Sequence, residues 1–167
     1  MIEKNGFLGG NLTAGLVGPC MTSFSLDGRT QLIRGIFDEF VRRMESLDGA
    51  VHPSKTVSGS PYSGFMTFGH EAVTPFDPEV AKRVAMEMTS QAGVELLLHT
   101  MVVDTVVEEG RTTGVIVANK SGMSFVPAAI TIDASGDGDV AARAGARFEY
   151  GRDADRAAQP MTLFFRI

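Results

Sequence analysis

The spacing of apolar residues divides the chain into two helical segments followed by a series of short strands. Residues 30–47 carry apolar side chains at intervals of three and four, which predicts an amphipathic helix over that range. A second helix is predicted to begin after Asp77, because Asp is a good N-cap residue and Pro78 suits the first helical position. It should run to about Gln91, with Gly93 as its stop.

Beyond the second helix, apolar runs alternate with turn residues, a pattern typical of strands and hairpins. The predicted strands are 94–98, 101–107, 114–118, 124–133 and 161–167, with a short helix over 139–144. The sequences at 108–111 and 119–122 are suited to hairpin turns between three of these strands. The predicted fold class is therefore α/β.

Two further segments, 6–28 and 51–75, lack a clean period and are predicted to be irregular. The first is rich in Gly, Ser and Thr, and the second contains three prolines, four serines and three glycines. An irregular segment as long as 51–75 is unusual inside a compact domain and is often a substrate or lid region. A disordered insert is the alternative interpretation.

Composition narrows the class of protein and of partner. The chain has 167 residues, of which 44% are hydrophobic and 21% charged, as in ordinary globular domains. Its net charge of −5, without a run of Lys or Arg, argues against nucleic acid as a partner. It has no apolar stretch of about 18 residues and no apolar signal-peptide core, so no membrane partner is expected and a cytoplasmic location is predicted.

The reactive side chains give few candidates for catalysis or metal binding. Cys20 is the only cysteine, which excludes a disulfide, a CxxC pair or a cysteine-bound iron–sulfur cluster within one chain. The histidines at 52, 70 and 99 do not have metal-ligand spacing, so no metal site is predicted. His99 is interpreted as structural. His70, beside Glu71 in the long irregular segment, is the more interesting candidate, but no catalytic residue is assigned.

Two stretches suggest that the backbone approaches a ligand closely. The apolar run Ile130–Asp133 predicts a buried strand, and it breaks into the small residues Ala134, Ser135 and Gly136. Near the start, Glu3-Lys-Asn-Gly-Phe-Leu-Gly-Gly-Asn11 places an acid shortly before a double glycine. In order and spacing, these stretches resemble the FAD-dependent oxidoreductases of the two-dinucleotide-binding-domain flavoprotein superfamily. The resemblance covers nearly the whole chain.

The resemblance implies FAD as cofactor and a role for each matched segment. Glu3 corresponds to the acid that accepts hydrogen bonds from the adenosine ribose, and the double glycine to the loop that passes close to the flavin. Val102 matches the strand that pairs with the adenine edge, and the small residues after Asp133 match a loop close to the cofactor. The implied cofactor-binding residues are Glu3, Lys4, Gly9, Gly10, Asn11, Thr13, Val102, Ala134, Ser135 and Gly136.

The same resemblance implies a fold and a reaction. The fold would be a single partial FAD-binding domain over residues 1–167, Rossmann-like, with a three-stranded β-meander insertion and flanking helices. The reaction would move a hydride or electrons between the flavin and a small-molecule substrate or electron donor or acceptor. Leu12 stands where flavin-dependent disulfide reductases of this fold have a redox cysteine, so that chemistry is not expected.

In the family, a strand and a G-x-G-x-x-G fingerprint precede the position of Glu3, and further chain follows the position of Ile167. We therefore expect a fragment that alone folds poorly or binds FAD weakly. Two alternatives stay open. One is a non-catalytic scaffold or a split-enzyme subunit completed by a partner chain, where the expected partner is a completing subunit or, in a homo-oligomer, a second copy of the chain. The other is an NAD-binding dehydrogenase that uses the Gly136 loop, although Asp137 and Asp139 would place negative charge beside its pyrophosphate.

Overall fold

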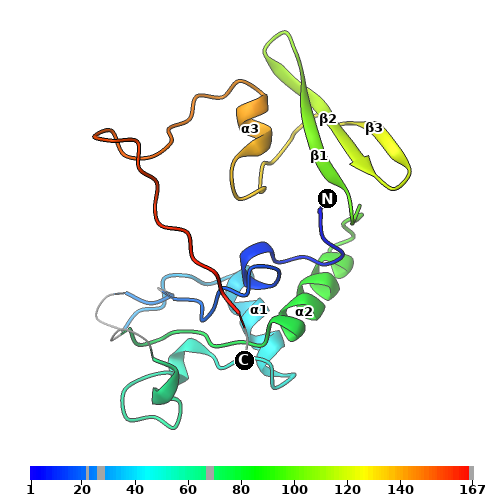
Figure 1. The fold of residues 1–167 in the computed structure, drawn as a ribbon. Helices are drawn as coiled ribbons and strands as arrows, with labels where there is room; N and C mark the ends of the chain where they lie inside the picture. The colour runs from blue at the N-terminus through cyan, green and yellow to red at the C-terminus, as the bar shows by residue number, and fades with distance from the viewer. Residues whose placement is uncertain (22, 26–28, 67–69, 166–167) are drawn as a thin grey trace. The chain divides into compact units, whose positions relative to one another are not determined.

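The computed structural model describes residues 1–21, 23–25, 29–66 and 70–165 of the chain (Figure 1). It divides into two compact units. Unit 1 comprises Met1–Gly6 and Glu95–Leu163, and unit 2 comprises Phe7–Val94 with the last residues from Phe164. Unit 2 contains two longer helices, and unit 1 contains a three-stranded antiparallel sheet and a short helix. The predicted α/β class is confirmed.

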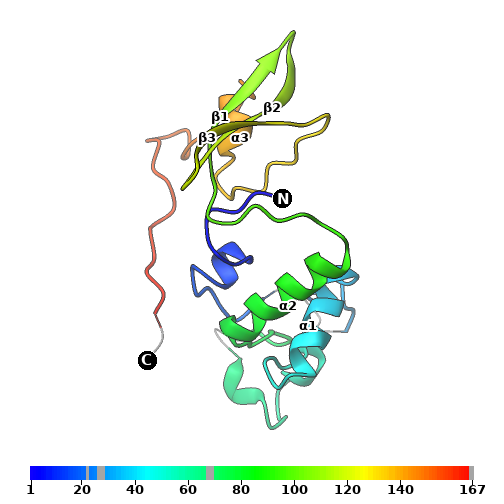
Figure 2. The ribbon, with the colours of Figure 1, turned by 90° about the vertical axis from the view of Figure 1, so that its right-hand side faces the viewer.

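The core of unit 2 is formed by helices α1 (Ile36–Glu45) and α2 (Pro78–Gln91), which pack against each other (Figure 2). Each helix has an apolar stripe at helical spacing, and the two stripes bury one another. The buried residues of this cluster are Val41, Met44, Ala81 and Val84. Partly buried side chains complete it: Phe37, Phe40, Ala50, Phe76, Val80 and Met88.

Helix α2 has the predicted ends. The Asp77 side chain accepts a hydrogen bond from the Glu79 N–H at 2.7 Å, which satisfies one of the free donors of the first turn. After the last turn, Gly93 adopts a φ of 69°, the left-handed conformation that commonly ends a helix.

The first helix is shorter than the predicted range 30–47. It begins at Ile36 because Gly35 has a φ of 64°, and the residues before it pair with an extended segment instead. The N–H groups of Leu32 and Ile33 both donate to the carbonyl of Ser23. Ile33 lies within the predicted helical range, but it precedes the helix and its side chain is exposed.

The irregular segments are confirmed as irregular in their described parts. Residues 51–66 contain only the 3-10 turns Pro53–Lys55 and Ser63–Phe65. One isolated bridge joins the two irregular segments by pairing Cys20 with Thr74, and another pairs Ala50 with Phe76, just outside the two ends of 51–75. A lid or substrate role for 51–75 stays a prediction.

Unit 1 is organised around a meander of β1 (Met101–Glu108), β2 (Arg111–Asn119) and β3 (Gly122–Pro127). Both predicted hairpin turns are confirmed by the register of the strands, and the three-stranded meander is confirmed with them. Helix α3 (Asp139–Arg143) matches the predicted short helix. Its Val140 packs with Val115 and Val117 in a small core.

Two predicted strands are wrong in the described part of the chain, and a third is shorter than predicted. Residues 94–98 contain only an isolated parallel bridge, between Leu97 and Ile2. The strand predicted over 124–133 ends at Pro127, and residues 161–165 form no strand. A strand needs a neighbour to accept its backbone hydrogen bonds, and residues 94–98, 128–133 and 161–165 have no ladder partner among the described residues. Residues 166–167 lie outside the described residues.

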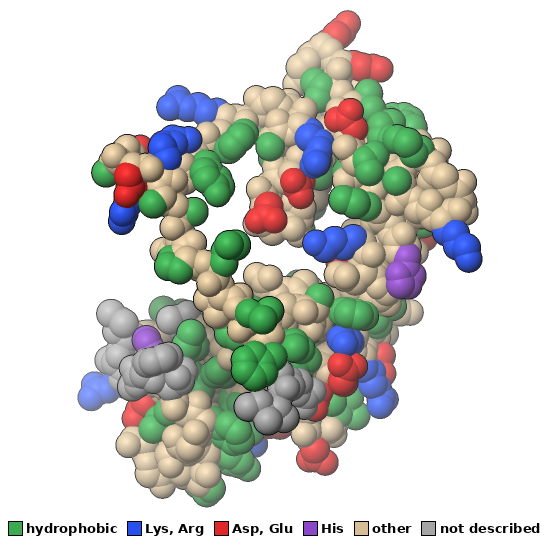
Figure 3. Space-filling view, viewed as in Figure 1, with side chains coloured by type: hydrophobic (Ala, Val, Ile, Leu, Met, Phe, Trp, Pro, Cys, Tyr) green, Lys and Arg blue, Asp and Glu red, His purple; other side chains and the backbone are tan. Residues whose placement is uncertain are grey.

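The largest difference from prediction is at the segment expected to be a buried strand. Ile130 and Ile132 expose 83% and 86% of their surface. Figure 3 shows that large apolar side chains also reach the surface elsewhere on the molecule. The Rossmann-like arrangement therefore stays a prediction. Over the described residues, no helix combines the length and the apolar character needed to cross a membrane.

Candidate functional site

The first residues of the chain run alongside residues 97–100 in unit 1. Leu97 donates its N–H to the Met1 carbonyl and accepts the N–H of Glu3, at 2.8 and 3.0 Å. Thr100 in turn donates its N–H to the Glu3 carbonyl at 3.0 Å. These bonds fix the backbone of Glu3 at the end of a short parallel pairing.

Among the described residues, Asn5 is the one that holds the Glu3 carboxylate. Its Oε1 accepts hydrogen bonds from the backbone N–H and the side-chain amide of Asn5, both at 2.8 Å. The Glu3 side chain is half-buried, whereas Lys4 is exposed. The carboxylate is thus oriented by the chain while part of it stays accessible.

The predicted flavin loop forms a tight turn in unit 2. Gly9 has a φ of 113°, and a side chain there would place its Cβ 2.5 Å from Cγ2 of Thr13. Glycine is required at this position both by conformation and by space. Thr13 is buried, and its hydroxyl donates to the Leu8 carbonyl at 2.8 Å, so this side chain holds the loop together. Gly10 and Asn11 are exposed.

Val102 lies in β1 next to an irregularity in the sheet. It pairs with Val117, whereas Asp104 pairs with Ile116, so Val103 is an extra residue in β1. Such a bulge bends a strand and redirects its side chains. Val102 is half-buried and packs against the cluster of Val115, Val117 and Val140.

The turn containing Ala134, Ser135 and Gly136 is organised by Asp133. Its carboxylate accepts the N–H of Ser135 at 2.9 Å and that of Ala141 at 2.8 Å. These backbone hydrogen bonds, Ala141 first and Ser135 next, hold the pKa of Asp133 below its usual value. All three residues of the turn are exposed, and Gly136 has a φ of 91°.

The same hydrogen bonds are relevant to the alternative function, in which the turn at Gly136 binds NAD. A dinucleotide fingerprint leaves backbone N–H groups free for a pyrophosphate at the start of a helix. Here the N–H of Ser135 and that of Ala141 donate to the Asp133 carboxylate, and the N–H of Asp139 donates to the Ser135 hydroxyl at 3.0 Å. The carboxylate and the hydroxyl thus already satisfy donors that such a loop would need, which does not favour this alternative.

The structure brings part of the predicted site together within unit 1. Ile2, next to Glu3, packs with Val102 against the cluster that contains Val140, and Val140 is the second residue of α3, which directly follows the Gly136 turn. The first residues, the meander and this turn therefore share one small core. Gly9, Gly10, Asn11 and Thr13 belong to unit 2 and are described with that unit.

The other side chains singled out in the sequence have ordinary surroundings. Cys20 is partly buried, and this burial raises the pKa of its thiol. His70 is exposed. The imidazole of His99 lies against Gly6, where an added Cβ would approach within 2.7 Å of two ring atoms. No group of three potential metal ligands occurs among the described residues.

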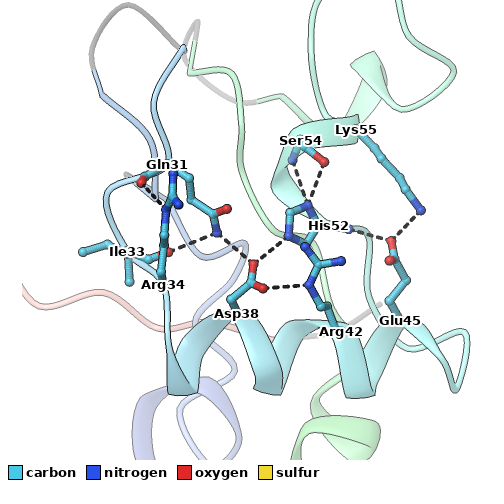
Figure 4. Close-up of polar contacts among 9 residues, drawn as sticks. All are labelled: Gln31, Ile33, Arg34, Asp38, Arg42, Glu45, His52, Ser54 and Lys55. Carbon is cyan, nitrogen blue, oxygen red and sulfur yellow. Dashed lines mark hydrogen bonds and ion pairs between the residues drawn. The ribbon is translucent and has the colours of Figure 1, made fainter.

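Sequence reasoning missed a polar network in unit 2, centred on Asp38 and His52 (Figure 4). His52 was considered only as a metal ligand, and Asp38 was not considered. The available signal was local: Asp38 and Arg42 stand four apart on a helix, and His52 precedes a Pro-Ser pair. Asp38 and His52 are 14 residues apart in the sequence, and only the tertiary structure brings their side chains into contact.

Comparison with known proteins identifies one family. The family model described as "FAD dependent oxidoreductase" matches residues 1–167, the whole of the chain. No curated protein and no solved structure matches the chain. A match of this extent implies FAD as the cofactor and an FAD-linked redox function in general. The chain belongs to the FAD-dependent oxidoreductase family.

Proposed function

We propose that the protein transfers a hydride or electrons between FAD and a small organic substrate, and that Glu3 binds the adenosine ribose. The whole-chain family match supports the redox class, and the oriented carboxylate of Glu3 supports the assignment of that residue. When bound, the flavin would carry the redox chemistry, and the chain would position it and its substrate.

The arrangement around Glu3 fits a ribose. Both hydrogen bonds from Asn5 go to Oε1, which leaves Oε2 without a hydrogen-bond partner among the described residues. A carboxylate oxygen fixed in this way can accept a bond from a ribose hydroxyl without first reorganising. Lys4 is exposed beside it and would add a positive charge near the cofactor phosphates.

The glycine loop fits the close approach of a planar ring. Gly9 and Gly10 are exposed, so their backbone can be reached from solvent. A Cβ added at Gly10 would meet no atom within 4 Å, so the space beside it is open. We assign this loop to the flavin and Val102 to the adenine. We assign Ala134, Ser135 and Gly136 to a loop that lies close to the cofactor.

The test measures the binding of FAD to the purified chain, with the quenching of flavin fluorescence as the readout. Glu3→Gln keeps the shape but removes the charge, and should weaken binding by about 10- to 100-fold, because a hydrogen bond to a charged group contributes roughly 1.5–3 kcal/mol. Glu149→Gln is the matched control, since Glu149 is an exposed acid in the same unit. Equal affinities of the two variants would overturn the role of Glu3. A complete lack of FAD binding would favour a scaffold or a subunit that needs a partner chain.

A further inference from the structure

The polar network of unit 2 contains a serine, a histidine and an aspartate joined in series (Figure 4). The Ser54 hydroxyl lies 2.7 Å from Nδ1 of His52, and Nε2 of His52 lies 2.9 Å from Oδ1 of Asp38. Asp38 comes from helix α1, whereas Ser54 lies in the 3-10 turn Pro53–Lys55 and His52 is the N-cap of that turn. This is the connectivity that activates a serine in hydrolases of unrelated folds, although there the two ring nitrogens have exchanged roles.

The hydrogen bonds determine which nitrogen of His52 carries the proton. Asp38 is a carboxylate with a lowered pKa, because it accepts hydrogen bonds from His52, Arg42 and Gln31, so Nε2 must be the donor to it. The backbone N–H of Ser54 donates to Nδ1 at 3.3 Å, so Nδ1 must carry the lone pair. The hydroxyl of Ser54 is therefore the donor to Nδ1, and its proton is directed at a base.

Burial differs along the series in the way a reactive serine requires. The side chain of His52 is only 6% exposed, which protects the base from reagents and from competing water. Ser54 is exposed, so an electrophile can reach its hydroxyl. The carboxylate of Asp38 is fixed by Arg42 at 2.7 Å and by the Gln31 amide at 3.0 Å, which keeps the imidazole in one orientation.

We propose that Ser54 is a nucleophilic site that is acylated by activated carboxylic esters, with His52 as its base and Asp38 as a positioning residue. In this reaction a bond forms between the Ser54 oxygen and the ester carbonyl carbon. The bond from that carbon to the leaving alcohol or phenol breaks, and the serine proton passes to Nδ1 of His52 and then to the leaving oxygen. No change of oxidation state occurs, so the reaction is separate from the flavin chemistry.

The test is reaction of the folded chain with p-nitrophenyl acetate, read out as p-nitrophenolate release and as acetyl groups located by peptide mass spectrometry. Ser54 should be acetylated at least tenfold faster than Ser58, an exposed serine of the same segment. In urea the two serines should react equally slowly. Acetylation confined to lysines, or equal rates at the two serines in folded protein, would overturn the proposal.

Variants separate base catalysis from folding. His52→Gln should slow acetylation of Ser54 by about 100-fold or more, the range that a positioned base contributes. Asp38→Asn should slow it less, and Ser58→Ala should leave it unchanged. Each rate is compared with the thermal unfolding midpoint of the same variant. If the His52→Gln variant stays folded and its Ser54 reacts at the wild-type rate, the proposal is wrong. If this variant unfolds, the rates of Ser54 and Ser58 in the wild-type protein decide whether the proposal holds.

Discussion

The helix pair of unit 2 and the segment after the meander in unit 1 are both rich in apolar residues, but only the first buries them. Met44 and Val84 are each 1% exposed, whereas Ile130 and Ile132 are more than 80% exposed. A helix satisfies its own backbone hydrogen bonds and needs only a second apolar face. A strand needs both an apolar contact and a neighbouring strand.

This difference shows where stability should reside in the molecule. The apolar side chains of α1 and α2 are buried against one another within unit 2, so they should contribute fully to the free energy of unfolding. The side chains of Ile130 and Ile132 are exposed in the described structure, so they should contribute little to stability.

The largest expected effect tests this comparison directly. Met44→Ala should lower the free energy of unfolding of unit 2 by about 2–5 kcal/mol, because it removes a buried side chain and leaves a cavity. Ile132→Ala should change stability by no more than about 0.5 kcal/mol, because its side chain is exposed. Urea unfolding, with hydrogen exchange of α1 and α2 amides, measures both. An equal loss in the two variants would show that Ile132 is covered in solution.

The same contrast explains what the sequence could predict of the fold. Helix α2 was predicted with its ends because Asp77, Pro78 and Gly93 act locally. The meander was predicted because its two hairpin turns bring neighbouring strands together. The prediction of a strand at Ile130 was wrong. An apolar run indicates which side chains a strand could bury, but it does not indicate whether a neighbouring strand is available to pair with it.

The candidate site divides in a similar way. The double glycine and Glu3 stand in short motifs that a sequence displays directly, and their roles toward FAD stay predictions. The series of Ser54, His52 and Asp38 was missed, because it forms only when a turn folds onto helix α1. Residues distant in sequence carry no shared pattern before the fold is known.

A second prediction sharpens the comparison inside the sheet. A Cβ added at Gly114 would overlap the carbonyl of Val126 and the ring of Phe125, so Gly114→Ala should cost about 1–3 kcal/mol and loosen the pairing of β2 with β3. Gly64→Ala is the matched control in unit 2, since its Cβ would meet no atom within 4 Å. Exchange of the β3 amides should rise in the first variant only. Unchanged exchange there would mean that the sheet relaxes without cost.

The smallest expected effect concerns two aspartates, one in each unit, that are held in different ways. The pKa of Asp38 is lowered by hydrogen bonds from the side chains of His52, Arg42 and Gln31, and that of Asp133 by backbone N–H groups, Ala141 first. In both cases the unfolded chain, with a pKa near 3.8, takes up its proton before the folded chain does. Stability from each carboxylate is therefore complete above that pKa and is lost as the pH falls through the folded value.

Salt should separate the two carboxylates. The Arg42 side chain is 62% exposed, so its ion pair with Asp38 is open to screening, whereas the N–H groups on Asp133 carry no net charge. Asp38→Asn and Asp133→Asn should each remove about 1 kcal/mol of acid-sensitive stability at low salt. In high salt the loss should shrink for Asp38→Asn and persist for Asp133→Asn. Urea midpoints from about pH 6 to about pH 2 measure this. An equal response to salt would show that Arg42 adds nothing beyond the neutral hydrogen bonds, and the contrast between the two carboxylates would fail.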